Sequence, residues 1–289
     1  MKNVLVLLII ATMNYKIRKI HIIANRLSRT GSHHWERVIV FLFFLLLPFS
    51  VNAQTTSYTQ LANEAQFARA ISNKWAGELW LGAAFSNTPS NDKVLSTNIQ
   101  RYFFLWAHYY LSPKWKLSSS FAYYYNKDVP DIGQFFSPEY RLTLQGMYYI
   151  HKTGYTLATR MRLDLRYMMD AEGEFDFKYR YRQMIKFVKP INSQVLRKGV
   201  FYFLTTEELL FKPEAKTKGL NFFDRNRFDI GGGYQITDDI AVELAYLNEF
   251  VPRDGGNDVY NVMEFTLTFN NLFPNIRKNF ASRSSEAKE

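Results

Sequence analysis

Two histidines follow residue 53, His108 and His151, and each is a side chain that can serve as a general base. Ser112 and Ser118–Ser120 are near His108 in sequence, and a Ser-His-acid hydrolase needs a serine within hydrogen-bond reach of its histidine. The sequence does not identify which serine that would be, and His151 falls in an expected turn. The favoured interpretation of His108 is a packed or interfacial ring. No catalytic residue is therefore assigned, and a lipid hydrolase or transferase stays an alternative.

Metal and cofactor chemistry have little support in the sequence. The chain has no cysteine, which excludes thiolate metal sites, and two isolated histidines do not make a zinc site without carboxylates. The run Gly231-Gly232-Gly233 lacks the lysine of a phosphate loop and lies within an expected strand, where glycine allows bending or close backbone approach. We expect no metal and no cofactor.

Charged and apolar residues alternate from Tyr155 to Tyr167. Because successive side chains of a strand point to opposite faces, Leu163 and Leu165 share an apolar face, while Arg160 and Arg162 share a charged one. Aromatic residues stand at both ends of the apolar face, as in a strand that crosses a membrane from interface to interface. This is the clearest strand of the chain.

The same alternation recurs along the chain and predicts about ten strands. They are 76–86, 97–111, 115–126, 140–150, 155–167, 177–188, 200–211, 226–236, 240–251 and 259–269. Tight connections alternate with longer polar ones, which is typical of a transmembrane barrel with short periplasmic turns and longer outer loops. The expected fold is an all-β, antiparallel, up-and-down transmembrane β-barrel. An even strand number would leave both ends of the chain on the periplasmic side.

The charged faces of these strands would line the barrel interior. The interior charge lattice is predicted to contain Arg160, Arg162, Asp164, Arg166, Arg180, Arg182, Arg227, Asp229, Glu243 and Glu264. A barrel of this size is largely filled by side chains, and charges there need partners. The favoured interpretation is an ion-paired structural filling. The alternatives are a pocket for a small anionic solute and a narrow anion-favouring channel.

The N-terminal segment has the pattern of a secretory signal. Arg37 precedes the apolar run 38–49, and Val51 and Ala53 supply the small residues of a cleavage site. The predicted organisation is a signal peptide with an N-terminal extension at 1–53 and a polar periplasmic segment, with helical spacing, at 54–74. The barrel is expected at 75–271 and a polar tail at 272–289. No apolar run after Ala53 reaches the length of a membrane-spanning helix.

The net charge of +10 overstates the basicity of the exported part. Residues 1–53 hold seven basic residues and one acidic residue, so the remainder has 29 basic and 25 acidic residues, a net charge of +4. That balance argues against a nucleic-acid partner.

A soluble β-barrel or sandwich is the main alternative to a membrane protein. It would bury its apolar face and expose its charged face to water.

Several short motifs occur in a recognisable order: 160–164 (RMRLD), 179–182 (YRYR), 223–228 (FDRNRF), 231–234 (GGGY) and 243–247 (ELAYL). In this order and spacing the chain resembles, from about Glu78 to Phe269, the family called domain of unknown function 2490. The resemblance implies an outer-membrane barrel-like protein of Gram-negative bacteria and supplies no activity or site residue. The sequence thus predicts a monomeric barrel in contact with outer-membrane lipid.

Overall fold

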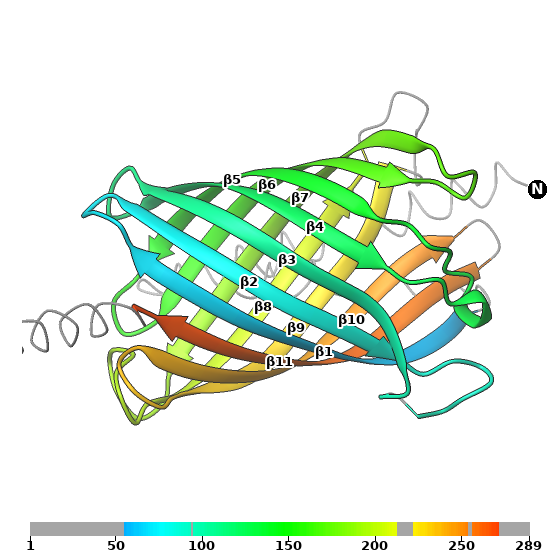
Figure 1. Cartoon of the computed structure of the whole chain (residues 1–289). Coiled ribbons are helices and arrows are strands. Elements are labelled where there is room, and N and C mark those ends of the chain that lie inside the picture. Colours follow the sequence, from blue (N-terminus) through cyan, green and yellow to red (C-terminus); the bar gives the residue numbers. More distant parts are fainter. Residues whose placement is uncertain (1–54, 94, 213–221, 254–255, 272–289) are drawn as a thin grey trace, which may run out of the picture. The chain divides into compact units, whose positions relative to one another are not determined.

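The computed structural model describes residues 55–93, 95–212, 222–253 and 256–271, which form a single closed β-barrel (Figure 1). Its eleven strands are β1 (Thr55–Ala70), β2 (Trp75–Ser86), β3 (Thr97–Tyr110), β4 (Trp115–Asn126), β5 (Glu139–His151), β6 (Thr156–Met169), β7 (Phe175–Pro190), β8 (Phe201–Phe211), β9 (Phe223–Gln235), β10 (Ile240–Arg253) and β11 (Gly256–Asn270). The short 3-10 helix η1 (Pro130–Ile132) lies between β4 and β5. The predicted all-β barrel is confirmed, with one strand more than expected.

Consecutive strands pair antiparallel throughout, and β1 closes the barrel by pairing in parallel with β11. An odd number of alternating strands makes the first and last strands run the same way, so this one parallel ladder is unavoidable. Closure leaves no open sheet edge, which matters because an unpaired edge exposes a row of backbone donors and acceptors.

The additional strand corrects the prediction for residues 54–74. They were expected to form a polar, helical periplasmic segment, with the barrel beginning at residue 75, yet Thr55–Ala70 is the strand β1. Leu61 and Ala65 suggested helical spacing, and the outward face of β1 also holds small or polar residues such as Thr59 and Asn63. The alternation of two faces was therefore hidden in the sequence. Pairing with β2 and β11 determines the structure of this segment instead.

The two ends of the barrel differ in their connections. One end, called here the short-turn end, carries the four-residue connections 71–74, 111–114, 152–155 and 236–239 and one longer connection, 191–200. The other end, the long-loop end, carries 87–96, 127–138, 170–174 and 212–222 and one short connection, 254–255. Because β1 and β11 run in parallel, β1 begins at the long-loop end and β11 ends at the short-turn end. The expectation that both strand termini share one end, which rested on an even strand number, is therefore wrong.

The outer face of the barrel is apolar. Leu144, Met161 and Phe265 point outward and are more than 40% exposed, whereas Arg162 and Arg182 point inward and are buried. Outward aromatic rings gather near both ends. Pairs at the short-turn end are Phe67–Phe269, Trp75–Tyr109, Trp115–Tyr148, Tyr155–Phe187 and Phe201–Tyr234, and pairs at the long-loop end are Tyr123–Tyr140, Tyr167–Phe175 and Tyr181–Phe211. An apolar band between two aromatic girdles results.

Within the described ranges, no helix is long and apolar enough to cross a bilayer. The predicted signal peptide at 1–53 and the predicted polar tail at 272–289 lie outside the described residues.

Candidate functional site in the barrel interior

The interior is filled by charged side chains that pair across neighbouring strands. In one group, Glu139 accepts two hydrogen bonds of 2.8 Å from Arg166 and one of 2.6 Å from Arg141. Arg141 also donates to the Tyr124 hydroxyl at 2.8 Å and lies 3.9 Å from Asp164. All of these side chains are buried or nearly so, and each charge faces at least one opposite charge. Such pairing is what allows charges to remain in a poorly solvated interior.

A second group is centred on Glu208 of β8. Arg182 donates to both of its carboxylate oxygens, Arg160 donates to Oε1, and Arg182 lies 3.5 Å from Asp164. Asp164 also accepts a hydrogen bond of 2.9 Å from Thr143. Asp164 therefore links this group to the group around Glu139, and the two form one network across β5 to β8.

A third group lies toward the long-loop end. Asp224 is within 3.1 Å of both Arg180 and Arg225 and within 2.8 Å of Lys212. Arg225 also donates to Glu249 at 2.6 Å, and Arg227 donates to the second oxygen of Glu249. This group fills the interior beside β7, β9 and β10.

Three of the predicted carboxylates make no ion pair with the predicted arginines. In the described part of the chain no ion pair joins Asp229, Glu243 or Glu264 to an arginine. Asp229 accepts from the Thr206 hydroxyl, and Glu243 accepts from the Tyr202 hydroxyl at 2.8 Å. Glu264 lies on the inner face of β11, opposite Ala62 of β1. The arginines are paired instead with carboxylates that the sequence interpretation missed.

The sequence interpretation left several interior ion-pair residues out of the predicted lattice. They are Glu139, Glu208, Asp224 and Glu249, together with the bases Arg141 and Arg225. Glu139 and Asp224 lie where their strands begin, just outside the ranges predicted from the sequence, and Glu208 lies in the predicted strand 200–211, which has apolar residues on both faces. The available signal was a spacing of two residues, which places Glu139 on the same face as Arg141 and Glu208 on the same face as Leu210.

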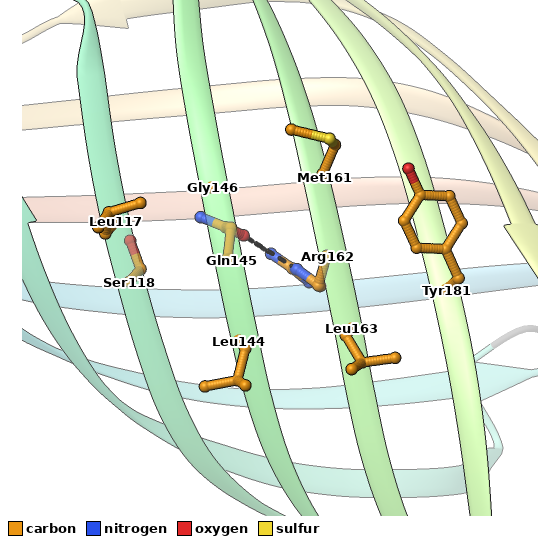
Figure 2. Close-up of a pocket in the computed structure, with 9 residues that line it drawn as sticks. All are labelled: Leu117, Ser118, Leu144, Gln145, Gly146, Met161, Arg162, Leu163 and Tyr181. Atoms are coloured by element: carbon orange, nitrogen blue, oxygen red, sulfur yellow. Dashed lines mark hydrogen bonds between the residues drawn. The ribbon is translucent and has the colours of Figure 1, made fainter.

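Arg162 differs from the other interior arginines. Its Nε and one terminal nitrogen both donate to the Gln145 side-chain oxygen, at 2.9 and 2.6 Å (Figure 2). Its guanidinium lies 5.1 Å from the Trp106 ring centre. Among the described residues no carboxylate lies within 4 Å of it. Arg162 is thus buried and held by an amide and an aromatic face, and its charge is not neutralised by direct contact.

Aromatic side chains fill the interior beside β2, β3 and β4. Phe104, Trp106 and Tyr124 are buried with Ala122, and Trp80 and Tyr102 pack against them. Trp106 is 4% exposed and its ring stacks on His108 at 5.8 Å. This aromatic cluster and the charge network lie side by side across the lumen, since Arg141 of the network contacts Tyr124 and Arg162 contacts Trp106.

His108 lies on the short-turn side of the aromatic cluster. Its Nδ1 is 2.8 Å from the Ser118 hydroxyl, and its Nε2 is 2.9 Å from Glu78 Oε2. His108 and Ser118 are buried, and Glu78 is half-buried. The sequence placed Ser118 among several candidates and did not identify Glu78, which is thirty residues from His108. The second histidine, His151, is far from this arrangement in the fold and bonds the Thr153 carbonyl at the β5–β6 turn.

The outward face of the barrel has a hollow over β4 to β7, next to the strand of His108. Gly146 has no side chain, and the outward side chains around it leave a hollow of about 390 Å³ on β4 to β7 (Figure 2). Leu117, Leu144, Met161, Leu163 and Tyr181 line it, and the inward-pointing Ser118, Gln145 and Arg162 contribute from the same strands. The described residues contain no group of three or more His, Cys, Asp or Glu side chains placed to hold a metal ion.

Residues 55–260 match a protein family described as "Protein of unknown function (DUF2490)". The chain belongs to this family. The match covers almost the whole DUF2490 barrel, from β1 into β11. It begins at residue 55, so it includes the strand that the sequence interpretation had left outside the barrel. No curated protein matches the sequence.

Three solved structures are similar to this DUF2490 chain at low sequence identity. One described as a bacterial polysaccharide outer membrane secretin is 13% identical over 69% of this chain, with a TM-score of 0.44, and the alignment spans 66% of that protein, just under two thirds of its length. The NanC porin is 15% identical over 73% of this chain and 98% of its own, with a TM-score of 0.44. LpxR from Salmonella typhimurium is 8% identical over 71% and 86%, with a TM-score of 0.44.

Proposed function

We propose that this protein spans the outer membrane of Gram-negative bacteria as a monomeric barrel whose interior is filled by ion-paired side chains, with a structural or small-solute-binding role. The single observation that carries the proposal is the contrast between its two faces. Apolar side chains are exposed all around the outside, while charges are collected inside and paired with one another.

The outer face supports contact with lipid. A soluble monomer rarely exposes contiguous apolar patches larger than a few hundred Å². Here exposed apolar side chains occur on the outward face of nearly every strand, for example Leu105, Leu142, Leu209 and Leu244. Hydrocarbon is the solvent that such a surface fits, and aromatic rings near both ends fit the two interfaces of a bilayer.

The filled interior favours a structural or binding role over a wide conduit. The arginines that would select anions in a channel already bind Glu139, Glu208, Asp224 and Glu249, and the aromatic cluster occupies the lumen beside β2 to β4. Arg162 is the exception, because no carboxylate contacts it directly. It is the interior position best suited to attract a small anionic solute.

Fractionation of the native host tests the proposal. The folded protein is expected in the outer-membrane fraction and is expected to migrate differently in gels before and after boiling, as a stable barrel does. A soluble periplasmic species with unchanged mobility on boiling would overturn it.

A further inference from the structure

We propose that Ser118, His108 and Glu78 form a catalytic triad for cleavage of a carboxylic ester at the short-turn end of the lumen. This inference goes beyond the proposed membrane role. It rests on the hydrogen bonds that His108 makes on both sides of its ring, to a hydroxyl at 2.8 Å and to a carboxylate at 2.9 Å. A nucleophile, a base and a group that orients the base are recognised by such geometry and not by their order in sequence.

The register of the sheet holds these groups in place. His108 of β3 is directly opposite Ser118 of β4, Ser118 is opposite Gln145 of β5, and Gln145 is opposite Arg162 of β6. All four side chains point into the lumen, so they form one row across four strands. Rigid strands keep side chains in position better than loops do, which suits a site that must be preorganised.

The carboxylate determines which nitrogen of His108 acts as the base. Glu78 accepts a hydrogen bond, so Nε2 carries the proton, and Nδ1 is left with the lone pair that accepts the Ser118 hydroxyl proton. Glu78 thereby fixes the tautomer and favours the positively charged ring that forms when the serine attacks. Stacking of Trp106 on His108 fixes the plane of the ring.

Gln145 is placed to stabilise the oxyanion. Its side-chain oxygen is occupied by two hydrogen bonds from Arg162, so its amide nitrogen is turned away from Arg162 and toward the strand of Ser118 (Figure 2). Side-chain amides can donate to the negative oxygen of a tetrahedral intermediate. Arg162 acts here as a positioning residue, because it orients Gln145 and adds positive charge beside the site.

The charged side chains around the triad indicate which class of ester would bind. Lys116 precedes Ser118 by two residues on the same inner face and, in the described part of the chain, has no carboxylate within 4 Å. Lys116 interacts electrostatically with Glu78 and, less strongly, with Lys186, Arg160 and Arg162, so basic groups outnumber this carboxylate around the site. The Glu78 side chain keeps 14% exposure and Lys116 is not fully buried, whereas Trp106 is 4% exposed and closes the other side. We therefore infer a substrate with a negative charge near its ester, entering from the short-turn end.

The reaction balances with water as the second substrate. Ser118 Oγ attacks the carbonyl carbon while His108 Nδ1 takes the hydroxyl proton. The bond from this carbon to the alcohol oxygen then breaks, and His108 returns the proton to the departing alkoxide. Water, deprotonated by His108, attacks the acyl-enzyme, and the acid product leaves as Ser118 regains its proton.

The test uses the full chain, folded in detergent micelles, with a fluorescent fluorophosphonate probe and p-nitrophenyl butyrate. The wild type should be labelled at Ser118 and should hydrolyse the ester.

Ser118→Ala should abolish labelling and lower kcat about 10³-fold or more. Gln145→Leu should lower kcat about 10²-fold with little change in KM, as loss of an oxyanion donor does. Glu78→Gln should reduce kcat strongly and Glu78→Asp should restore part of it, which a merely structural role would not do.

Ser120→Ala is the matched control. Ser120 is two residues farther along the same inner face, is 2% exposed, and its hydroxyl makes no hydrogen bond within the described residues. This variant should keep the labelling and the activity of the wild type. A folded wild type, judged by its mobility before and after boiling, that is neither labelled nor faster than Ser118→Ala would overturn the proposal. Because the assay is done in micelles, that failure is distinct from failure of the membrane proposal.

Discussion

Glu208 accepts hydrogen bonds from arginines of two different strands, Arg160 of β6 and Arg182 of β7, and is only 4% exposed. Its removal would leave two guanidinium groups in the interior without their main partner. Loss of one partner from a buried ion pair costs about 3–5 kcal/mol, because the remaining charge stays poorly solvated. Glu208→Ala should therefore lower the free energy of unfolding in urea by about that amount.

The exposed Glu172 of the β6–β7 loop provides the comparison. Glu172→Ala should change the free energy of unfolding by less than about 0.5 kcal/mol, as surface substitutions usually do. Equal effects of the two substitutions would mean that the interior ion pairs contribute nothing to stability.

Close packing at Gly233 gives a second prediction for single residues. A Cβ atom at Gly233 would overlap the ring of Tyr202, whose hydroxyl donates to Glu243. Gly233→Val should therefore displace the ring and cost about 1–3 kcal/mol in the free energy of unfolding, as overpacking does. The cost should largely disappear when Tyr202→Ala is also present, and a cost that is unchanged in the double variant would contradict the contact.

At the scale of elements, β1 is the strand that sequence patterns missed. Ala65 of β1 lies opposite Leu267 of β11 in the parallel ladder, and both side chains point outward. Neighbouring strands are about 4.8 Å apart, within the range that a disulfide can bridge. Because the chain has no natural cysteine, the double variant Ala65→Cys/Leu267→Cys should form a disulfide on mild oxidation, seen as a gel-mobility shift that a reductant reverses.

The pair Ala65→Cys/Val259→Cys is the control for this crosslink. Val259 is opposite Ser57 in the same ladder, so it is eight residues from the position that faces Ala65. That separation is roughly 26 Å along a strand. Crosslinking of both pairs alike, or of neither, would mean that β1 does not occupy this place.

Strand prediction succeeded where one face is strongly apolar and the other strongly charged, as in β6. It was wrong for β1, where small and polar residues on the outward face conceal the alternation. The strand β8 was predicted, but its inner face was not identified, because Glu207 points outward and bonds Asn226 while Glu208 points inward. The interior arginines were recognisable from this alternation. Their carboxylate partners were not, because pairing depends on the register between strands, which is a property of the closed barrel. The contact of His108 with Glu78 also depends on register, here between β2 and β3, and was not predicted for the same reason.

At the scale of the whole molecule, the filled lumen predicts the absence of steady conduction. Purified protein inserted into planar bilayers should give no sustained ion current, because ion pairs and the aromatic cluster occupy the interior. Anion-selective currents that decrease in Arg162→Ala or Arg180→Ala would contradict this and would support the channel alternative. Substitution of the two carboxylates Glu139→Ala and Glu208→Ala together is the positive control, since it removes filling and pairing at once.

The most direct measurement concerns which side chains contact hydrocarbon. Single spin labels, attached to cysteines in place of Leu142, Leu163 and Phe265, would be compared in reconstituted bilayers with a label in place of Thr143, whose side chain points inward. The three outward labels should be highly accessible to oxygen and protected from a water-soluble nickel chelate, and the label at Thr143 should be inaccessible to both. Outward labels that meet the nickel chelate freely, or that are shielded from oxygen, would contradict the account.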